Sequence, residues 1–65
     1  MELYLIYSDR YNRSLISIVD DFDKAKIIAN DNDGVIEEVL VDIKTGKLES
    51  VGVYDQYGKC VEKDD

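Results

Sequence analysis

The sequence predicts a small α+β domain in the order ββαβββ, with one helix packed on one face of a mainly antiparallel sheet. Three observations lead to this fold class. Apolar residues alternate with a period of two in most segments, the period becomes helical after residue 20, and glycine turns separate the later segments. The 65 residues predict a single small domain, 1–65, because a chain of this length buries only about 60% of its unfolded surface.

The first two strands form a predicted hairpin. In ELYLIYS (residues 2–8), Leu3, Leu5 and Tyr7 point to one face, and Tyr4 and Ile6 point to the other. Both faces are apolar, which favours an interior position in the sheet. Turn formers at residues 9–13 lead into the second strand, SLISIV, at residues 14–19.

The segment DDFDKAKIIAN (residues 20–30) predicts the helix, from about residue 22 to 30. Asp20 or Asp21 can cap its start, and Asp23 suits the positive end of the helix dipole. Ile27 lies away from the apolar face, so it is either a wide edge of the core or an exposed contact point. The apolar face consists of Phe22, Ala25, Ile28 and Ala29, and its small alanines allow close approach to a sheet.

Three further strands follow the helix. The stretch NDNDG ends the helix, with Gly34 expected to take a positive φ, and VIEEVLVDI (residues 35–43) is the third strand. The turns KTGK and DQYGK then separate the strands LESVGVY and CVEK. Asp64 and Asp65 are expected to fray. We expect the sheet face without a helix to carry an apolar patch suited to a dimer, formed by Tyr4, Ile6, Ile16 and Ile18.

Composition indicates a cytoplasmic setting. The chain has no histidine, proline or tryptophan, and Cys60 is its single cysteine, which excludes disulfide or zinc cross-links within one chain and fits a reducing compartment. The apolar run at residues 3–7 is too short for a signal segment or a membrane span. Five tyrosines suit a partly exposed interface, which favours a homodimer.

The stretch NDNDG partly resembles a calcium loop. With Gly34 at the sixth position of an EF-hand loop, Asp31 and Asp33 fall on ligand positions. The first and twelfth positions, however, are Ala29 and Leu40, so both end ligands are missing. We therefore expect no metal site and no cofactor.

Catalytic motifs are incomplete. GVYDQYGKC differs from a phosphate loop because five residues separate Gly52 from Gly58 and Cys60 replaces the hydroxyl residue. Cys60 has no histidine to activate it and is expected to be a half-buried apolar residue. Glu37 and Glu38 are neighbours on a strand and point apart. We expect a protein without enzymatic activity.

Negative charge is concentrated in the middle third. The formal net charge is −7, and residues 20–42 contribute eight acids against two lysines, or −6. Only Arg10 and Arg13, beside Tyr11, resemble a nucleic-acid patch, so direct nucleic-acid binding is disfavoured. The carboxylates are expected to line one edge, spaced like a phosphate backbone and aimed at a basic partner protein, with Asp33 and Glu38 facing solvent. The predicted partner-binding residues are Asp20, Asp21, Asp23, Asp31, Asp33, Glu37, Glu38, Asp42 and Ile27.

Small size, the MELYLIYS strand, the capped DDFDKAKIIAN helix and the acid-rich middle together resemble the small acidic proteins of bacteriophages and other mobile elements. That resemblance implies an inhibitor of a host defence enzyme, of the anti-CRISPR type, which acts by occupying a surface. Two alternatives stay open: an oligomer that binds a small ligand in a tyrosine-lined seam, and a passive structural or regulatory domain. In the last case the acidic middle is a solvated face that maintains solubility.

Overall fold

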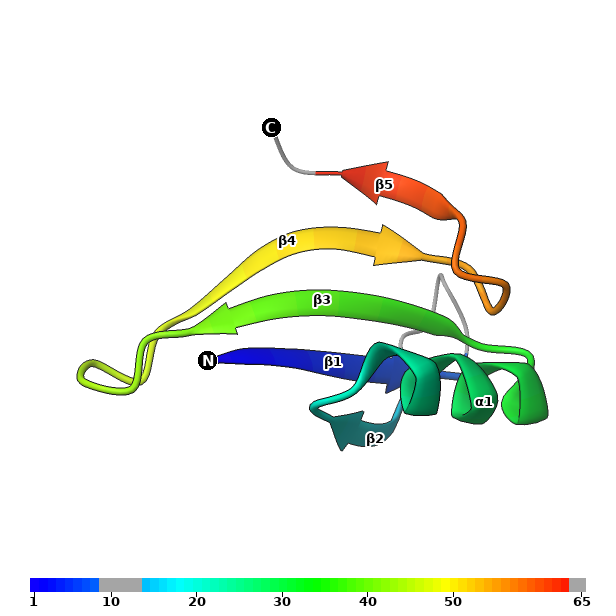
Figure 1. The fold of residues 1–65 in the computed structure, drawn as a ribbon, viewed down its shortest axis with the longest axis horizontal. Coiled ribbons are helices and arrows are strands. Elements are labelled where there is room, and N and C mark those ends of the chain that lie inside the picture. Colours follow the sequence, from blue (N-terminus) through cyan, green and yellow to red (C-terminus); the bar gives the residue numbers. More distant parts are fainter. Residues whose placement is uncertain (9–13, 64–65) are drawn as a thin grey trace.

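A computed structural model describes residues 1–8 and 14–63 of the chain. The predicted turn at residues 9–13 and the predicted fraying of Asp64 and Asp65 lie outside the described residues. One five-stranded antiparallel sheet has the order β2-β1-β3-β4-β5, and one helix packs against it (Figure 1), which confirms the α+β prediction. The elements are β1 Glu2–Tyr7, β2 Leu15–Val19, α1 Phe22–Asn32, β3 Val35–Val41, β4 Leu48–Tyr54 and β5 Cys60–Lys63.

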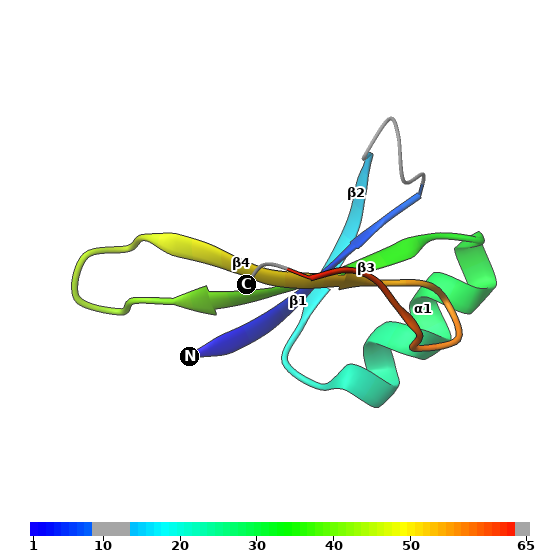
Figure 2. The same cartoon turned by 90° about the horizontal axis from the view of Figure 1, so that it is seen from above.

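Strand β1 lies in the interior of the sheet, as its two apolar faces predict. It pairs with β2 on one side and with β3 on the other. The turn of the β3–β4 hairpin extends beyond the N-terminal end of β1 (Figures 1 and 2). Strand β3 ends at Val41, two residues earlier than predicted, because the Asp42 carboxylate accepts hydrogen bonds from the backbone N–H groups of Lys44 and Thr45 and starts the turn.

Helix α1 begins at its predicted position. The Asp21 carboxylate accepts hydrogen bonds from the backbone N–H of Asp23 at 2.8 Å and of Lys24 at 3.3 Å, so Asp21 is the N-cap. The helix ends two residues later than predicted. The Asn32 side chain donates to the Ile28 carbonyl at 2.8 Å, which supports the last turn.

The residue with positive φ at the helix end is Asp33, not Gly34 as the sequence suggested. Asp33 is in the left-handed region at φ 52°, a conformation that Asp tolerates better than most residues. Gly34 is needed for a different reason, since a Cβ at this position would collide with the carbonyl oxygen of Tyr7. The glycine therefore allows the start of β3 to pack closely against the end of β1.

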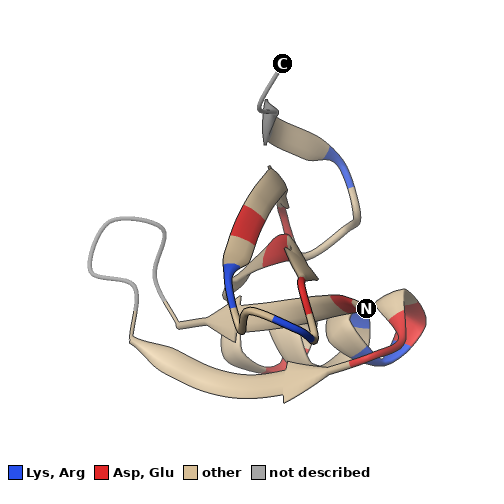
Figure 3. Ribbon diagram, turned by 90° about the vertical axis from the view of Figure 1, so that its left-hand side faces the viewer, with Lys and Arg blue, Asp and Glu red and all other residues tan. Residues whose placement is uncertain are grey.

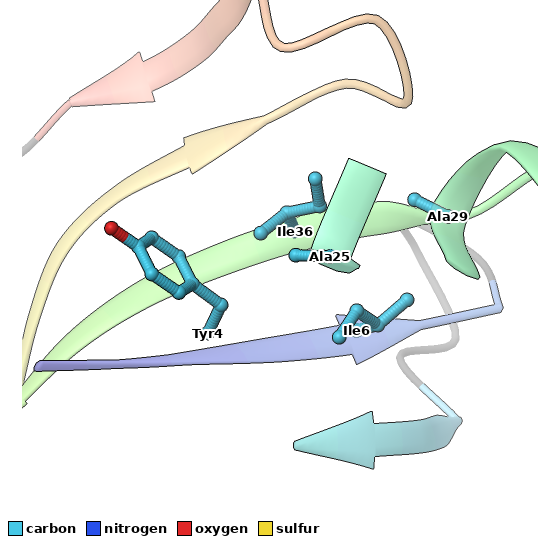
Figure 4. Packing of buried hydrophobic residues seen from close by; sticks show 5 residues of the cluster. All are labelled: Tyr4, Ile6, Ala25, Ala29 and Ile36. Carbon is cyan, nitrogen blue, oxygen red and sulfur yellow. The ribbon is translucent and has the colours of Figure 1, made fainter. Parts of the chain in front are cut away.

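The core lies between α1 and the sheet. Ile6 of β1 and Ile36 of β3 are paired and fully buried, with Ala25 and Ala29 of the helix packed over them (Figure 4). The predicted apolar face of α1 is thereby confirmed. Tyr4 belongs to the same cluster. The expectation that Tyr4 and Ile6 lie on the uncovered face is wrong, because the pleat of β1 directs them toward the helix instead.

Within residues 1–8 and 14–63, the helix lies on one face of the sheet and no helix covers the other face (Figure 2). In the register of the sheet, Leu5 lies opposite Ile18 of β2 and opposite Glu37 of β3, so these residues share that face. Ile18 is exposed, as expected. Ile16 is exposed as well and lies at an irregularity in the β1–β2 pairing, where Ile6 pairs with Ser17 and the next residue pairs with Leu15.

Candidate functional site

The predicted partner-binding residues do not form one continuous edge. Asp20, Asp21 and Asp23 are at the start of α1, whereas Asp31 and Asp33 are at its other end. An eleven-residue helix separates its ends by roughly 16 Å. The remaining acids of the set are on the sheet and at the hairpin turn, and Figure 3 shows acidic positions on the helix and on both strands of the β3–β4 hairpin.

Glu37 and Glu38 lie on opposite faces of β3, as their adjacent positions predict. Glu37 accepts hydrogen bonds from the Tyr7 hydroxyl at 3.2 Å and from the Ser50 hydroxyl at 2.9 Å. Glu38 accepts one from the Tyr54 hydroxyl at 3.0 Å, on the helix side of the sheet. The expectation that Glu38 faces solvent is wrong, because it is half-buried beside that tyrosine.

Asp42 lies at the turn that follows β3. Its carboxylate is engaged with the backbone N–H groups of Lys44, at 2.9 Å, and Thr45, at 3.4 Å. These hydrogen bonds lower the pKa of Asp42 below its ordinary value, and the bond from the Lys44 N–H has the largest effect. This side chain shapes the turn and lies apart from the helix.

The outer face of α1 joins three of the predicted residues. Ile27 is 63% exposed, which identifies it as a surface residue and excludes the alternative of a core edge. Asp23 and Asp31 lie four residues before and after it, so the three side chains form a row along one side of the helix. Lys26 pairs with Asp23 at 3.4 Å, and in the described part of the chain Asp31 takes part in no ion pair. We call these three residues the outer row.

A second arrangement was missed at the level of sequence. The rings of Tyr4, Phe22 and Tyr54 meet at the start of the helix, with Phe22 at 5.3 Å from the centroid of each tyrosine ring. Together with Glu38 and Gly58 they line a hollow of 260 Å³, which we call the aromatic hollow. The rings come from β1, α1 and β4, so only the register of the sheet brings them together.

Two carboxylates accompany these rings. The Tyr4 hydroxyl donates to Glu2 at 2.8 Å, in the same way that Tyr54 donates to Glu38. Hydrogen bonds with Glu38 and then with Tyr4 hold the pKa of Glu2 below its ordinary value. The pKa of Tyr4 is raised mainly by burial and secondly by its hydrogen bond to Glu2. The pKa of Tyr54 is raised mainly by its hydrogen bond to Glu38 and secondly by burial.

A larger hollow of 430 Å³ lies near the turn of the β3–β4 hairpin. Among the described residues it has no aromatic ring, and one of its three charged residues, Asp42, is already bonded to the turn backbone. The other two, Lys47 and Glu49, carry opposite charges. Its lining consists of Leu40, Val41, Asp42, Lys47, Leu48 and Glu49.

Cys60 is exposed at the start of β5, which corrects the expectation of a half-buried side chain. The segment between Gly52 and Cys60 is the β4–β5 hairpin, as the turn interpretation predicts.

Within residues 1–8 and 14–63, no three His, Cys, Asp or Glu side chains converge on a point suited to a metal ion. In the same part of the chain, no helix has the length and apolar character needed to cross a membrane. The arginine patch around Tyr11 lies outside the described residues.

Comparison with protein-family models, with curated proteins and with solved structures yielded no match to this chain.

Proposed function

We propose that this chain is a protein-binding module that contacts a basic surface of another protein through the outer face of α1. The observation that carries this proposal is the outer row, in which the exposed Ile27 lies between Asp23 and Asp31. The helix packs on the sheet through its opposite side, by Ala25 and Ala29. The outer row is therefore available without any change to the core.

Charge and apolar area have different parts in this contact. Residues 20–33 carry five acids against two lysines, a net charge of −3, which attracts a basic partner and accelerates encounter. Burial of the Ile27 side chain would contribute about 1.5–3 kcal/mol and would act mainly on the lifetime of the complex. The role that we propose is that of a phage-type inhibitor, which acts by covering the surface that it binds.

The test compares matched variants against a partner captured from host lysate. Asp31→Lys and Glu49→Lys change the net charge equally, and both residues are exposed, but only Asp31 belongs to the outer row. We expect Asp31→Lys to slow association at low salt more than Glu49→Lys does, because electrostatic steering depends on charges near the contact. Ile27→Ala should instead speed dissociation, with the helix retained because alanine is a good helix former.

The kinetics separate this proposal from a merely solvated acidic face. If the two lysine variants associate at the same rate, and Ile27→Ala dissociates like the parent, the outer row is not the contact surface. The isolated variants should first show the far-ultraviolet circular dichroism of the parent, so that a loss of binding is not caused by unfolding.

A further inference from the structure

The aromatic hollow lies outside the outer row and has a chemistry of its own. Phe22 stands between the rings of Tyr4 and Tyr54, tilted by 56° to the first and by 74° to the second. The three rings therefore meet at steep angles to one another, and all three line the 260 Å³ space. Figure 4 shows the Tyr4 ring lying over the sheet, to one side of the buried Ile36 and Ala25.

The polar groups around this space are mainly acceptors. The hydroxyl protons of Tyr4 and Tyr54 are directed to Glu2 and Glu38, which leaves lone pairs on the phenol oxygens and on the carboxylates. The N–H of Gly58 is also engaged, since it donates to the Asp55 carbonyl at 3.0 Å. A ligand that fits this lining must donate hydrogen bonds.

The same groups favour a positive charge. Among the described residues, the lining includes Glu38 and no lysine or arginine, and Glu38 shares a hydrogen bond with the neighbouring Glu2, so this carboxyl pair supplies the negative charge at the hollow. Aromatic faces attract cations as well. The chain itself supplies an instance, because the Lys26 ammonium lies 5.4 Å from the centroid of Phe22 while it pairs with Asp23.

We propose that the aromatic hollow binds a primary alkylammonium group, held by Glu38 and the two phenol oxygens and surrounded by the rings of Tyr4, Phe22 and Tyr54. Such a group is positively charged, donates three hydrogen bonds and carries an apolar stem that packs on the rings. It belongs either to a free amine or to a lysine side chain of another protein. The inference does not depend on the outer row, and it stands if that proposed contact is disproved.

The test follows backbone amide shifts by NMR during titration with n-butylammonium chloride and, separately, with Nα-acetyl-lysine methylamide. We expect saturable shifts that centre on Tyr4, Phe22, Tyr54 and Gly58. Binding of both probes would indicate any alkylammonium group, and binding of the lysine derivative alone would indicate a partner's side chain. If n-butanol produces the same saturable shifts, or if sodium chloride at equal ionic strength reproduces them, the proposed site is disproved.

Two variants with the same change in charge make the test specific. Glu38→Gln keeps the size of the side chain and should weaken n-butylammonium binding by about tenfold or more, because it removes one carboxyl group of the pair whose negative charge holds the cation. Glu49→Gln removes an exposed carboxylate of β4 that does not line the aromatic hollow, and it should leave the affinity unchanged. Equal affinity of Glu38→Gln and the parent would overturn the proposal.

A further pair of variants covers the case in which Glu38→Gln does not fold. Glu2→Gln alters the neighbouring carboxylate, and Tyr54→Phe keeps the ring but removes the hydroxyl. Each should weaken binding while the amide spectrum stays dispersed as in the parent. If Glu2→Gln and Tyr54→Phe both fold and both bind n-butylammonium as tightly as the parent, the proposed alkylammonium site is excluded.

Discussion

Some isoleucines of this protein are buried in the core, where they stabilise the fold, and others are exposed on the surface. Ile6 and Ile36 are paired across β1 and β3 and are fully buried, whereas Ile27 extends into solvent. A domain of this size has a free energy of unfolding of about 3–10 kcal/mol. One buried isoleucine is therefore a large part of the total.

Replacement of these isoleucines should have opposite outcomes. Ile6→Ala removes a fully buried side chain and should reduce the free energy of unfolding by about 2–5 kcal/mol, a large part of the total. Ile27→Ala should change it by less than about 0.5 kcal/mol. Urea denaturation followed by circular dichroism measures both. A similar loss for the two variants would contradict the assignment of Ile6 to the core and Ile27 to the surface.

The tyrosines beside the carboxylates should respond to alkaline pH. The pKa values of Tyr4 and Tyr54 are raised above the ordinary value of 10.0, so the folded protein holds these protons after the unfolded chain has released them. Their contribution to stability is complete below that value and is lost as pH rises through the higher folded values. Tyrosinate absorbance should show at least two late-titrating groups, and unfolding should become easier in the same range. Tyr54→Phe should reduce the number of late-titrating groups by one. If the number of late groups stays the same, and the group that is lost titrates near 10.0, the hydrogen bond from Tyr54 to Glu38 is contradicted.

At the scale of elements, the helix depends on its ends. Asp21 closes the start by bonding to two backbone N–H groups, and Asp33 closes the other end in a left-handed conformation. Both devices satisfy backbone groups that the helix itself leaves unpaired. An eleven-residue helix is too short to persist in isolation, so the caps and the packing on the sheet act together.

Loss of the N-cap should therefore be measurable. Asp21→Ala removes the acceptor for the N–H groups of Asp23 and Lys24, and should reduce the free energy of unfolding by about 0.5–2 kcal/mol. Asp20→Ala makes the same change in charge one residue earlier, outside the N-cap position, and serves as the control. Thermal unfolding of the two variants gives the comparison. Equal melting temperatures would mean that charge alone, and not the cap, stabilises the helix start.

The whole molecule has to hold an excess of negative charge within a small volume. Its net charge is −7 and its radius of gyration is 11.1 Å, which is close to the screening length of about 10 Å at 0.1 M salt. Most of its carboxylates therefore repel one another in dilute buffer. Screening should relieve this repulsion more in the folded state than in the expanded chain.

Salt should accordingly raise the melting temperature. Sodium chloride added from low ionic strength should stabilise the protein, and magnesium and calcium chloride should stabilise it by amounts equal to each other, because screening does not distinguish the two ions. Differential scanning calorimetry at matched ionic strengths measures this effect. A larger gain with calcium than with magnesium would indicate a specific site and would contradict the expectation that the NDNDG stretch binds no calcium.

The sequence alone determined the elements of this protein and their order. Period-two segments, the capped helix and the glycine turns depend on residues that are close together in the sequence. Each can therefore be predicted without knowledge of the rest of the chain. For the same reason, the opposite directions of Glu37 and Glu38 and the apolar face of α1 followed directly from local geometry. The position of β1 inside the sheet followed from its two apolar faces.

Only the tertiary structure decided which residues meet. The direction of Tyr4 and Ile6 toward the helix depends on which side of the sheet α1 covers, and no local pattern encodes that choice. The aromatic hollow depends on a register that places Tyr4 opposite Glu38, with Phe22 and Tyr54 arriving from distant segments. The acidic middle third is continuous in the chain but divided in space, because a helix separates its own ends and a strand turns successive side chains to opposite faces.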